Sequence, residues 1–160
     1  MTLGQLTVTL EVNGARRRVD VPASMTLLEM VRTRLGLTGS KECCSEGECG
    51  ACTMIVDGEP INSCLMLAVE AEGSRVTTIE GLGAGGMTRL QESFLEAGAV
   101  QCGFCIPGMV MAATALLERV PKPSGAEVRE ALSGNLCRCG GYARICSAVV
   151  DATRAERSNV

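Results

Sequence analysis

The sequence predicts an α+β fold of two small domains, and three features of the chain support this. Up to about residue 80, polar and apolar side chains alternate as they do in strands, whereas later apolar residues recur at helical spacing. A glycine-rich stretch at 81–86 separates the two halves. At 160 residues, the chain can form two domains near the lower size limit for independent stability.

The first half, residues 1–80, has the pattern of two hairpins wrapped around one helix. Asn13-Gly14 stands between two alternating runs and predicts a tight turn. Thr26 and Glu29 have the spacing of a capping box, which predicts the start of a helix. The predicted strands are 6–12, 17–21, 53–56, 59–61 and 76–79, and the predicted helices are 26–36 and 65–71. This arrangement is typical of a β-grasp domain.

The second half, residues 81–160, predicts four helices with short connections, which indicates a four-helix bundle. The clearest apolar stripe comprises Met109, Ala112, Ala113, Leu116 and Leu117. The other helices are predicted at 89–97, after a capping box at 124–127, and along a stripe at 145–152. We expect Met109 and Met111 to pack in the core.

Eight of the ten cysteines fall into two sets of four, and the chain has no histidine. The first set is Cys44, Cys49, Cys52 and Cys64, and the second is Cys102, Cys105, Cys137 and Cys139. Four thiolates are the number that a 2Fe–2S cluster requires, and the first spacing, C-x4-C-x2-C, is that of plant-type ferredoxins. The sequence therefore predicts a plant-type ferredoxin β-grasp domain followed by a helical domain with a second 2Fe–2S cluster.

Zinc is the main alternative at both sets. It competes more strongly at the second, because Cys102-x2-Cys105 also begins many zinc sites, although Cys137-x-Cys139 is unusual among them. In the first loop, we expect Gly47 and Gly50 to let backbone N–H groups point at the sulfur atoms. Glu46 and Glu48 are expected to face solvent. At the second set, nearby helix N-termini should favour the thiolates.

Three other features have plainer interpretations. We expect Cys43 and Cys146 to be small buried apolar residues rather than ligands. The string Gly81-x-Gly83-x-x-Gly86 matches a dinucleotide fingerprint, but no parallel βαβ unit surrounds it and no acidic residue follows at the required distance. A flexible linker between domains is the better interpretation of these glycines.

Composition restricts the function further. A net charge of −3 without a large basic cluster argues against nucleic acid as a partner. No run approaches about 18 apolar residues, and the N-terminal pattern is not that of a secretory signal, so no membrane insertion is expected. Ten cysteines without such a signal indicate the cytoplasm. Without histidine, no general-base arrangement is evident, and we expect no substrate-converting site on this chain.

Three strings, Lys41–Thr53, Val100–Gly108 and Gly134–Tyr142, resemble the xanthine oxidase and xanthine dehydrogenase family of molybdenum hydroxylases. The chain is similar, over nearly its whole length, to the separate small iron–sulfur subunit of bacterial members. The chain departs from this pattern at Cys43, where relatives usually carry glycine, and at Gly140-Gly141, where many have a threonine before the second glycine. Neither departure removes a ligand.

The resemblance implies an electron-transfer role in a larger enzyme. A large subunit would hold a molybdenum–pterin cofactor, and electrons would pass to the helical-domain cluster, then to the ferredoxin-like cluster, then to FAD on a middle subunit. Gln101 and Cys139 would approach the pterin, and the assembly would be a dimer of heterotrimers. A purine or other N-heteroaromatic substrate is the expectation. The alternatives are an aldehyde, carbon monoxide or aromatic thioester oxidoreductase, or a free ferredoxin-like carrier.

Overall fold

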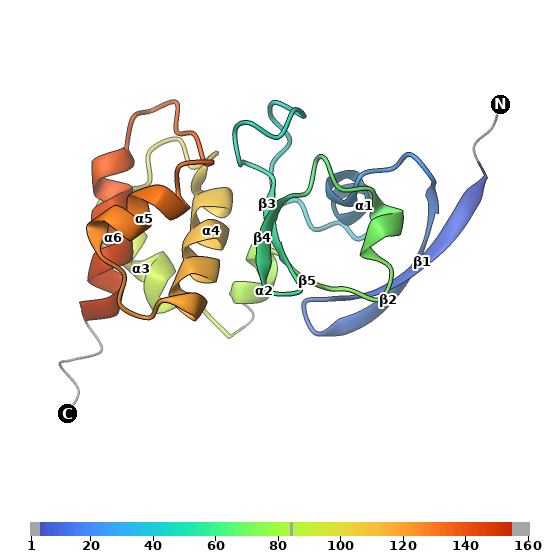
Figure 1. The fold of residues 1–160 in the computed structure, drawn as a ribbon, viewed down its shortest axis with the longest axis horizontal. Coiled ribbons are helices and arrows are strands. Elements are labelled where there is room, and N and C mark those ends of the chain that lie inside the picture. Colours follow the sequence, from blue (N-terminus) through green and yellow to red (C-terminus); the bar gives the residue numbers. More distant parts are fainter. Residues whose placement is uncertain (1–3, 84, 155–160) are drawn as a thin grey trace.

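A five-stranded mixed sheet and a group of helices pack side by side in the structure, a computed structural model that describes residues 4–83 and 85–154 (Figure 1). The strands are β1 (Gln5–Val12), β2 (Ala15–Pro22), β3 (Thr53–Val56), β4 (Glu59–Asn62) and β5 (Arg75–Thr77). The helices are α1 (Leu27–Thr33), the 3₁₀ turn η1 (Ala68–Ala71), α2 (Ile79–Leu82), α3 (Arg89–Glu96), α4 (Ile106–Arg119), α5 (Gly125–Ala131) and α6 (Tyr142–Arg154). The prediction of an α+β fold is confirmed.

The sheet has the strand order β2-β1-β5-β3-β4. β1 pairs antiparallel with β2 and parallel with β5, while β3 pairs antiparallel with both β5 and β4. Asn13 and Gly14 both have positive φ, 51° and 77°, as the tight turn of a right-twisted hairpin requires. Both hairpins stand where the sequence predicts them.

Helix α1 covers one face of this sheet. Its four buried residues, Leu27, Leu28, Met30 and Val31, pack with the inward side chains of the strands. The Thr26 hydroxyl accepts a hydrogen bond from the Glu29 N–H at 3.1 Å, which is the expected N-cap. This core holds the strands and α1 together.

Strand β3 is buried on both faces. Met54 and Val56 pack in the core under α1, whereas Ile55 points the other way and packs with Met111 and Ala115 of α4. Alternate residues of a strand point to opposite faces, so one four-residue strand contacts both halves of the chain. The two halves therefore share a buried apolar contact.

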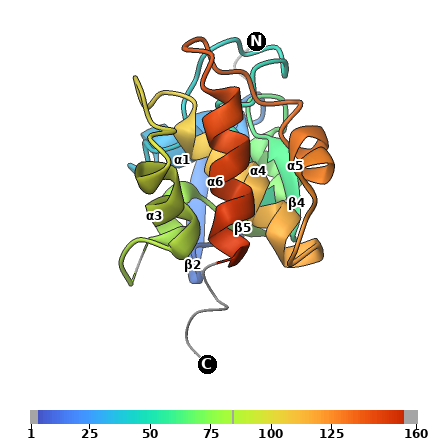
Figure 2. The same cartoon turned by 90° about the vertical axis from the view of Figure 1, so that its left-hand side faces the viewer.

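The helices α3 to α6 enclose a second core (Figure 2). Met109 of α4 is fully buried in it, and Ile145, Ala148, Val149 and Ala152 line the buried face of α6, as the stripes predict. Ser124 and Glu127 form the complete capping box predicted at the start of α5. Met111 is also buried, so the prediction that both methionines pack internally is confirmed.

The main differences from the sequence prediction concern the extent of elements. The helix expected at 26–36 covers only Leu27–Thr33. The helix expected at 65–71 is a 3₁₀ turn over Ala68–Ala71 only. The last strand begins at Arg75 and ends at Thr77, because Thr78 already precedes α2. The interpretation of 81–86 as a flexible linker is wrong in its first part, since Gly81 lies in α2 and packs so closely on Asn13 that a Cβ there would collide with it.

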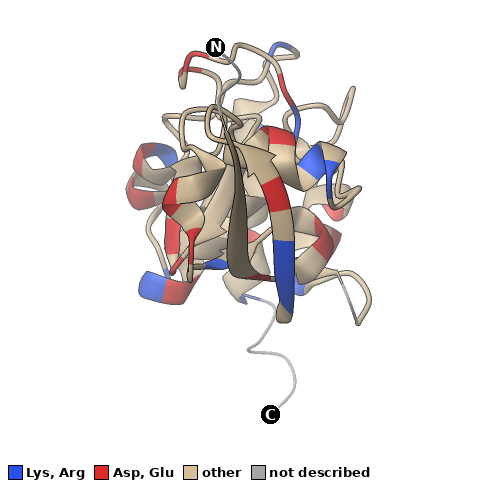
Figure 3. Ribbon diagram, turned by 90° about the vertical axis from the view of Figure 1, so that its right-hand side faces the viewer, with Lys and Arg blue, Asp and Glu red and all other residues tan. Residues whose placement is uncertain are grey.

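The outer strand of the sheet, β2, carries exposed arginines at 16–18 (Figure 3). Charge on an edge strand discourages pairing with another chain, so these residues have a structural explanation. Among the described residues, no helix combines the length and apolar character needed to cross a membrane.

Removing the side chain of Met111 should destabilise the contact between the two halves. Met111→Ala is expected to lower the free energy of unfolding by about 2–5 kcal/mol, because it empties a fully buried site. Met87→Ala is the matched control, since Met87 is 60% exposed and its loss should cost less than about 0.5 kcal/mol. Thermal unfolding followed by circular dichroism would measure both, and equal midpoints for the two variants would contradict the packing described here.

Candidate metal centres

The first set of cysteines lies on the loop between α1 and β3, with Cys64 just after β4. Two bonds from the end of β4 hold this loop in place. The Asn62 side-chain amide donates to the Gly47 carbonyl at 2.7 Å, and the Ser63 hydroxyl donates to the Cys52 carbonyl at 2.7 Å. The second hairpin therefore returns Cys64 to the loop that carries the other three thiols.

The loop curls its backbone toward Cys44, as the glycines predict. Gly47 and Gly50 have φ of 79° and 66°, in the left-handed region that favours glycine. The Glu46 N–H donates to Cys44 Sγ at 3.5 Å, and this bond, aided by further backbone donors, lowers the pKa of the Cys44 thiol to about 6. The side chains of Glu46 and Glu48 are exposed, as expected.

The four thiols of the first set form two pairs. Cys44 lies within hydrogen-bonding reach of Cys49, and Cys52 lies within reach of Cys64. Burial raises the pKa of the Cys52 thiol to about 12, in contrast to its neighbour Cys44. The set thus combines a half-buried thiol that ionises easily, Cys44, with a buried thiol, Cys52, that ionises only when a cation compensates the burial.

The second set comes from two loops of the helical half. Cys102 and Cys105 precede α4, and Cys137 and Cys139 lie between α5 and α6. Again the thiols form pairs, Cys102 with Cys139 and Cys105 with Cys137. The Cys137 N–H donates to the Tyr142 hydroxyl at 2.9 Å, which ties the second loop to the start of α6.

Burial and backbone donors act against each other in this set. Cys105 caps the N-terminus of α4, and burial raises the pKa of its thiol to about 12. A backbone N–H group at Cys105 acts to lower that pKa, but burial outweighs it. Backbone N–H groups do act on other thiols: the Phe104 N–H lowers the pKa of Cys102. At Cys137, burial acts in the opposite direction, but backbone donors led by Gly141 outweigh it and lower the pKa.

The arrangement of thiols fits two-iron clusters. All ten cysteines are free, so no disulfide competes for the eight candidates. A 2Fe–2S cluster uses four thiolates, two on each iron, and each set offers two pairs. Among residues 4–83 and 85–154, no three Cys, His, Asp or Glu side chains converge as a single-ion site would require.

A cavity of about 340 Å³ lies between the two sets of cysteines. It is lined by Cys43, Cys49, Ala51, Cys102, Phe104, Cys105, Leu136, Cys137, Arg138 and Tyr142. Cys43 is exposed at this cavity, so the prediction that it is a buried apolar residue is wrong. Cys146 is half-buried and packs against the second core, and burial raises the pKa of its thiol.

Gln101 and Cys139 are both exposed. Gln101 lies beside Gly141, two residues after Cys139, since a Cβ at that glycine would lie 3.4 Å from Gln101 Nε2. Cys102 is exposed as well, whereas Cys52 of the first set is buried. The second set therefore reaches the protein surface at Cys102 and Cys139.

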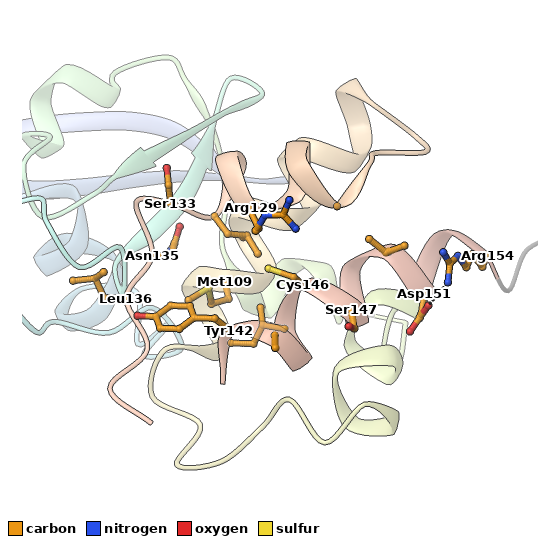
Figure 4. Close-up of a pocket in the computed structure, with 15 residues that line it drawn as sticks. Met109, Arg129, Ser133, Asn135, Leu136, Tyr142, Cys146, Ser147, Asp151 and Arg154 are labelled. Carbon is orange, nitrogen blue, oxygen red and sulfur yellow. Dashed lines mark hydrogen bonds and ion pairs between the residues drawn. The ribbon is translucent and has the colours of Figure 1, made fainter. Parts of the chain in front are cut away.

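A larger cavity, about 860 Å³, lies elsewhere, along α5 and α6 (Figure 4). Arg129, Cys146, Asp151 and Arg154 line it, and none of the eight candidate ligands does. It borders the loop that carries the second set at Ser133, Asn135 and Leu136. The larger of these two cavities is therefore not the one that the candidate ligands line.

Sequence reasoning did not identify Asn62, Asn135 or Tyr142 as supporting residues. Asn135 is buried, and its amide donates to the Gly50 carbonyl at 2.9 Å and to the Thr53 hydroxyl at 3.1 Å. Asn135 and Tyr142 lie within a few residues of the Cys137-x-Cys139 motif, and this nearness in the sequence was the one sign of a supporting role. Their partners are visible only in the folded chain.

Comparison with known proteins agrees with this geometry. Residues 10–78 match a family described as the 2Fe-2S iron-sulfur cluster binding domain, and residues 78–150 match a family described as the [2Fe-2S] binding domain. The chain is 49% identical to the nicotinate dehydrogenase small FeS subunit of Eubacterium barkeri, over 92% of this chain and 94% of that protein. It is 50% identical to the nicotine 6-hydroxylase small subunit of Paenarthrobacter nicotinovorans, over 91% and 88%.

A solved structure, quinoline 2-oxidoreductase from Pseudomonas putida 86, matches with a TM-score of 0.91 and 45% identity, covering 98% of this chain and 99% of that one. The chain belongs to the small iron–sulfur subunits of the xanthine dehydrogenase family of molybdenum hydroxylases. As in that family, it carries two 2Fe–2S binding domains and forms part of an oxidoreductase complex.

The contrast in thiol pKa values predicts different reactivity in the cluster-free chain. The Cys44 thiol should react with iodoacetamide with a midpoint at about pH 6, whereas Cys52 and Cys105, with pKa of about 12, should stay unreactive at neutral pH. Mass spectrometry of peptides would assign each modification.

The same change in pKa affects stability. Because folding lowers the pKa of the Cys44 thiol from 9.0 to about 6, this group stabilises the folded chain fully above pH 9, and the contribution is lost as the pH falls to about 6.

The urea-denatured chain is the control for the alkylation experiment, because its thiols no longer differ in surroundings. Equal alkylation rates for Cys44 and Cys52 in the folded chain, over the whole pH range, would contradict the described loop geometry.

Proposed function

We propose that each half of the chain binds one 2Fe–2S cluster and that the chain relays electrons from a molybdenum–pterin centre to FAD. The first cluster is held by Cys44, Cys49, Cys52 and Cys64, and the second by Cys102, Cys105, Cys137 and Cys139. The single observation that carries the proposal is that each of the two matched 2Fe–2S binding regions, residues 10–78 and 78–150, contains one complete set of four cysteines, the number of thiolates that such a cluster takes.

Each cluster belongs to its own domain in this proposal, residues 1–80 as a β-grasp domain and residues 81–160 as a four-helix bundle. The separate cores support the division. When bound, each cluster takes up and passes on one electron. The protein contributes backbone N–H donors near the sulfur atoms, such as that of Glu46 at Cys44, and these favour added negative charge.

The exposed positions of Gln101 and Cys139 support the direction of transfer. A group that receives electrons from another subunit must lie near the surface, and the second set does so at Cys102 and Cys139. We infer that Gln101 and Cys139 approach the pterin on the large subunit. Electrons then pass to the first set and on to FAD held by a middle subunit.

The three polypeptides are proposed to assemble as a dimer of heterotrimers in the cytoplasm. Ten free cysteines support a reducing compartment, where thiols remain available for metals. A separate small subunit of this kind has a role only with its partners, because electrons must enter from one subunit and leave to another.

The proposed substrate of the complex is an N-heteroaromatic compound. The relatives and the matching structure carry the names nicotinate dehydrogenase, nicotine 6-hydroxylase and quinoline 2-oxidoreductase, all of which refer to nitrogen-containing aromatic rings. The substrate would bind the large subunit, so the support comes from similarity between whole small subunits and from no residue of this chain.

Purification of the tagged chain at native expression tests the assignment. We expect a molybdenum protein and a flavoprotein to co-purify, with two irons and two acid-labile sulfides per cluster. The complex should oxidise nicotinate or quinoline rather than an aldehyde. A colourless protein that contains zinc and lacks sulfide would overturn the proposal, and so would a cluster-loaded chain that remains free of both partners.

Two ligand substitutions test the order of the clusters. Cys137→Ser should impair the second cluster and block turnover, because electrons leaving the molybdenum reach it first. Cys49→Ser should still allow substrate to reduce the molybdenum but should stop transfer to FAD. Rapid-reduction spectra of the two complexes would distinguish these effects, and the opposite pattern would refute the proposed order.

A further inference from the structure

The two ligand loops meet at one point, and hydrogen bonds join them there. The Leu136 N–H donates to the Cys49 carbonyl at 2.9 Å. Next to it, the Asn135 amide donates to the Gly50 carbonyl at 2.9 Å and to the Thr53 hydroxyl at 3.1 Å. Each partner is a candidate ligand or lies within two residues of one: Cys49 and Cys52 on one side and Cys137 on the other.

The backbone at Gly50 lies so close to Asn135 and to Gly108 of α4 that only glycine fits at positions 50 and 108. A Cβ at Gly50 would collide with the Asn135 amide, and a Cβ at Gly108, in the first turn of α4, would collide with the Gly50 carbonyl. Both positions carry glycine, so neither residue adds a side chain where Gly50 meets Asn135 and α4. The contact is therefore closer than ordinary packing between two domains.

Asn135 is buried, with only 6% of its surface exposed, and it uses its amide to hold this contact. Simple attachment of the two halves does not require it, because Ile55, Met111 and Ala115 already form a buried apolar contact between them. The two N–H groups of the buried Asn135 amide bond to the first ligand loop and to Thr53 beside it. These bonds fix the distance and the register between the two ligand loops. Its position points to a role in coupling the sites.

We infer that the hydrogen bond from Leu136 to Cys49 is the connection through which the two clusters exchange electrons, and that Asn135 is the residue that positions it. From Cys49 Sγ, covalent bonds lead to its own carbonyl oxygen. One hydrogen bond then reaches the Leu136 N–H, and covalent bonds continue to Cys137 Sγ. One electron moves along this route from the second cluster to the first. This inference rests on the proposed function, because it requires Cys49 and Cys137 to be cluster ligands.

Pulse radiolysis of the full chain, loaded with both clusters, tests the role of Asn135. A brief pulse adds less than one electron per chain, and the absorbance then follows redistribution between the clusters. Asn135→Ala should slow this step by about tenfold, the lower end of losses for residues that support metal ligands. It should also weaken the magnetic interaction between the two reduced clusters in electron paramagnetic resonance spectra.

Ser93→Ala is the matched control. Its buried hydroxyl also donates to a backbone carbonyl, that of Ala148 at 2.7 Å, but this bond joins α3 to α6 and not the two ligand loops. The substitution should leave the redistribution rate as it is. Slowing as large as that of Asn135→Ala would overturn the inference, because a general loss of packing would then explain both results.

Asn135→Asp keeps the side-chain volume and removes both N–H donors, so it serves if the alanine variant loses its clusters. An unchanged rate in cluster-loaded Asn135→Asp would overturn the inference, whereas a slower rate with full iron and sulfide content supports it. Absence of iron and sulfide from the unmodified chain would instead defeat the proposed function, which keeps the two failures distinguishable.

Discussion

Strand β3 is the element on which the relation between the two halves depends. It starts directly after Cys52, and its residues alternate between two cores: Met54 packs under α1, while Ile55 packs on α4. Because the strand is short and buried on both faces, the ligand loop that precedes it has little freedom to move. Thr53, the first residue of β3, then meets Asn135 from the other half. Burial of one strand thus sets the positions of both candidate centres.

Cluster binding and folding are coupled in this design. Burial gives Cys52 and Cys105 thiols with pKa of about 12, so neither ionises at neutral pH without a cation. Metal binding must displace those protons, and its free energy adds to that of folding. Cys44, with a pKa of about 6, can offer a thiolate beforehand. The first set therefore combines a half-buried thiol that ionises readily with a buried thiol that does not.

Local patterns predicted most of the fold and all candidate ligands. The Asn13-Gly14 turn, the cap at Ser124 and the spacing of the cysteines each act within a few residues, so the sequence alone shows them. The bond from Asn135 to Gly50 joins residues 85 positions apart, and no local pattern encodes it. Cys43 was misjudged for the same reason, because its exposure follows from the cavity between two distant loops.

The division of labour in the family explains why such different enzymes share one small subunit. The relatives are named for nicotinate, nicotine and quinoline, yet the chain matches each of them over most of its length. Under the proposed function the small subunit touches no substrate, so a change of substrate alters neither its cluster ligands nor the contact between its two loops. A Cβ at Gly50 would collide with Asn135, and a Cβ at Gly108 would collide with the Gly50 carbonyl, so this contact tolerates no added side chain.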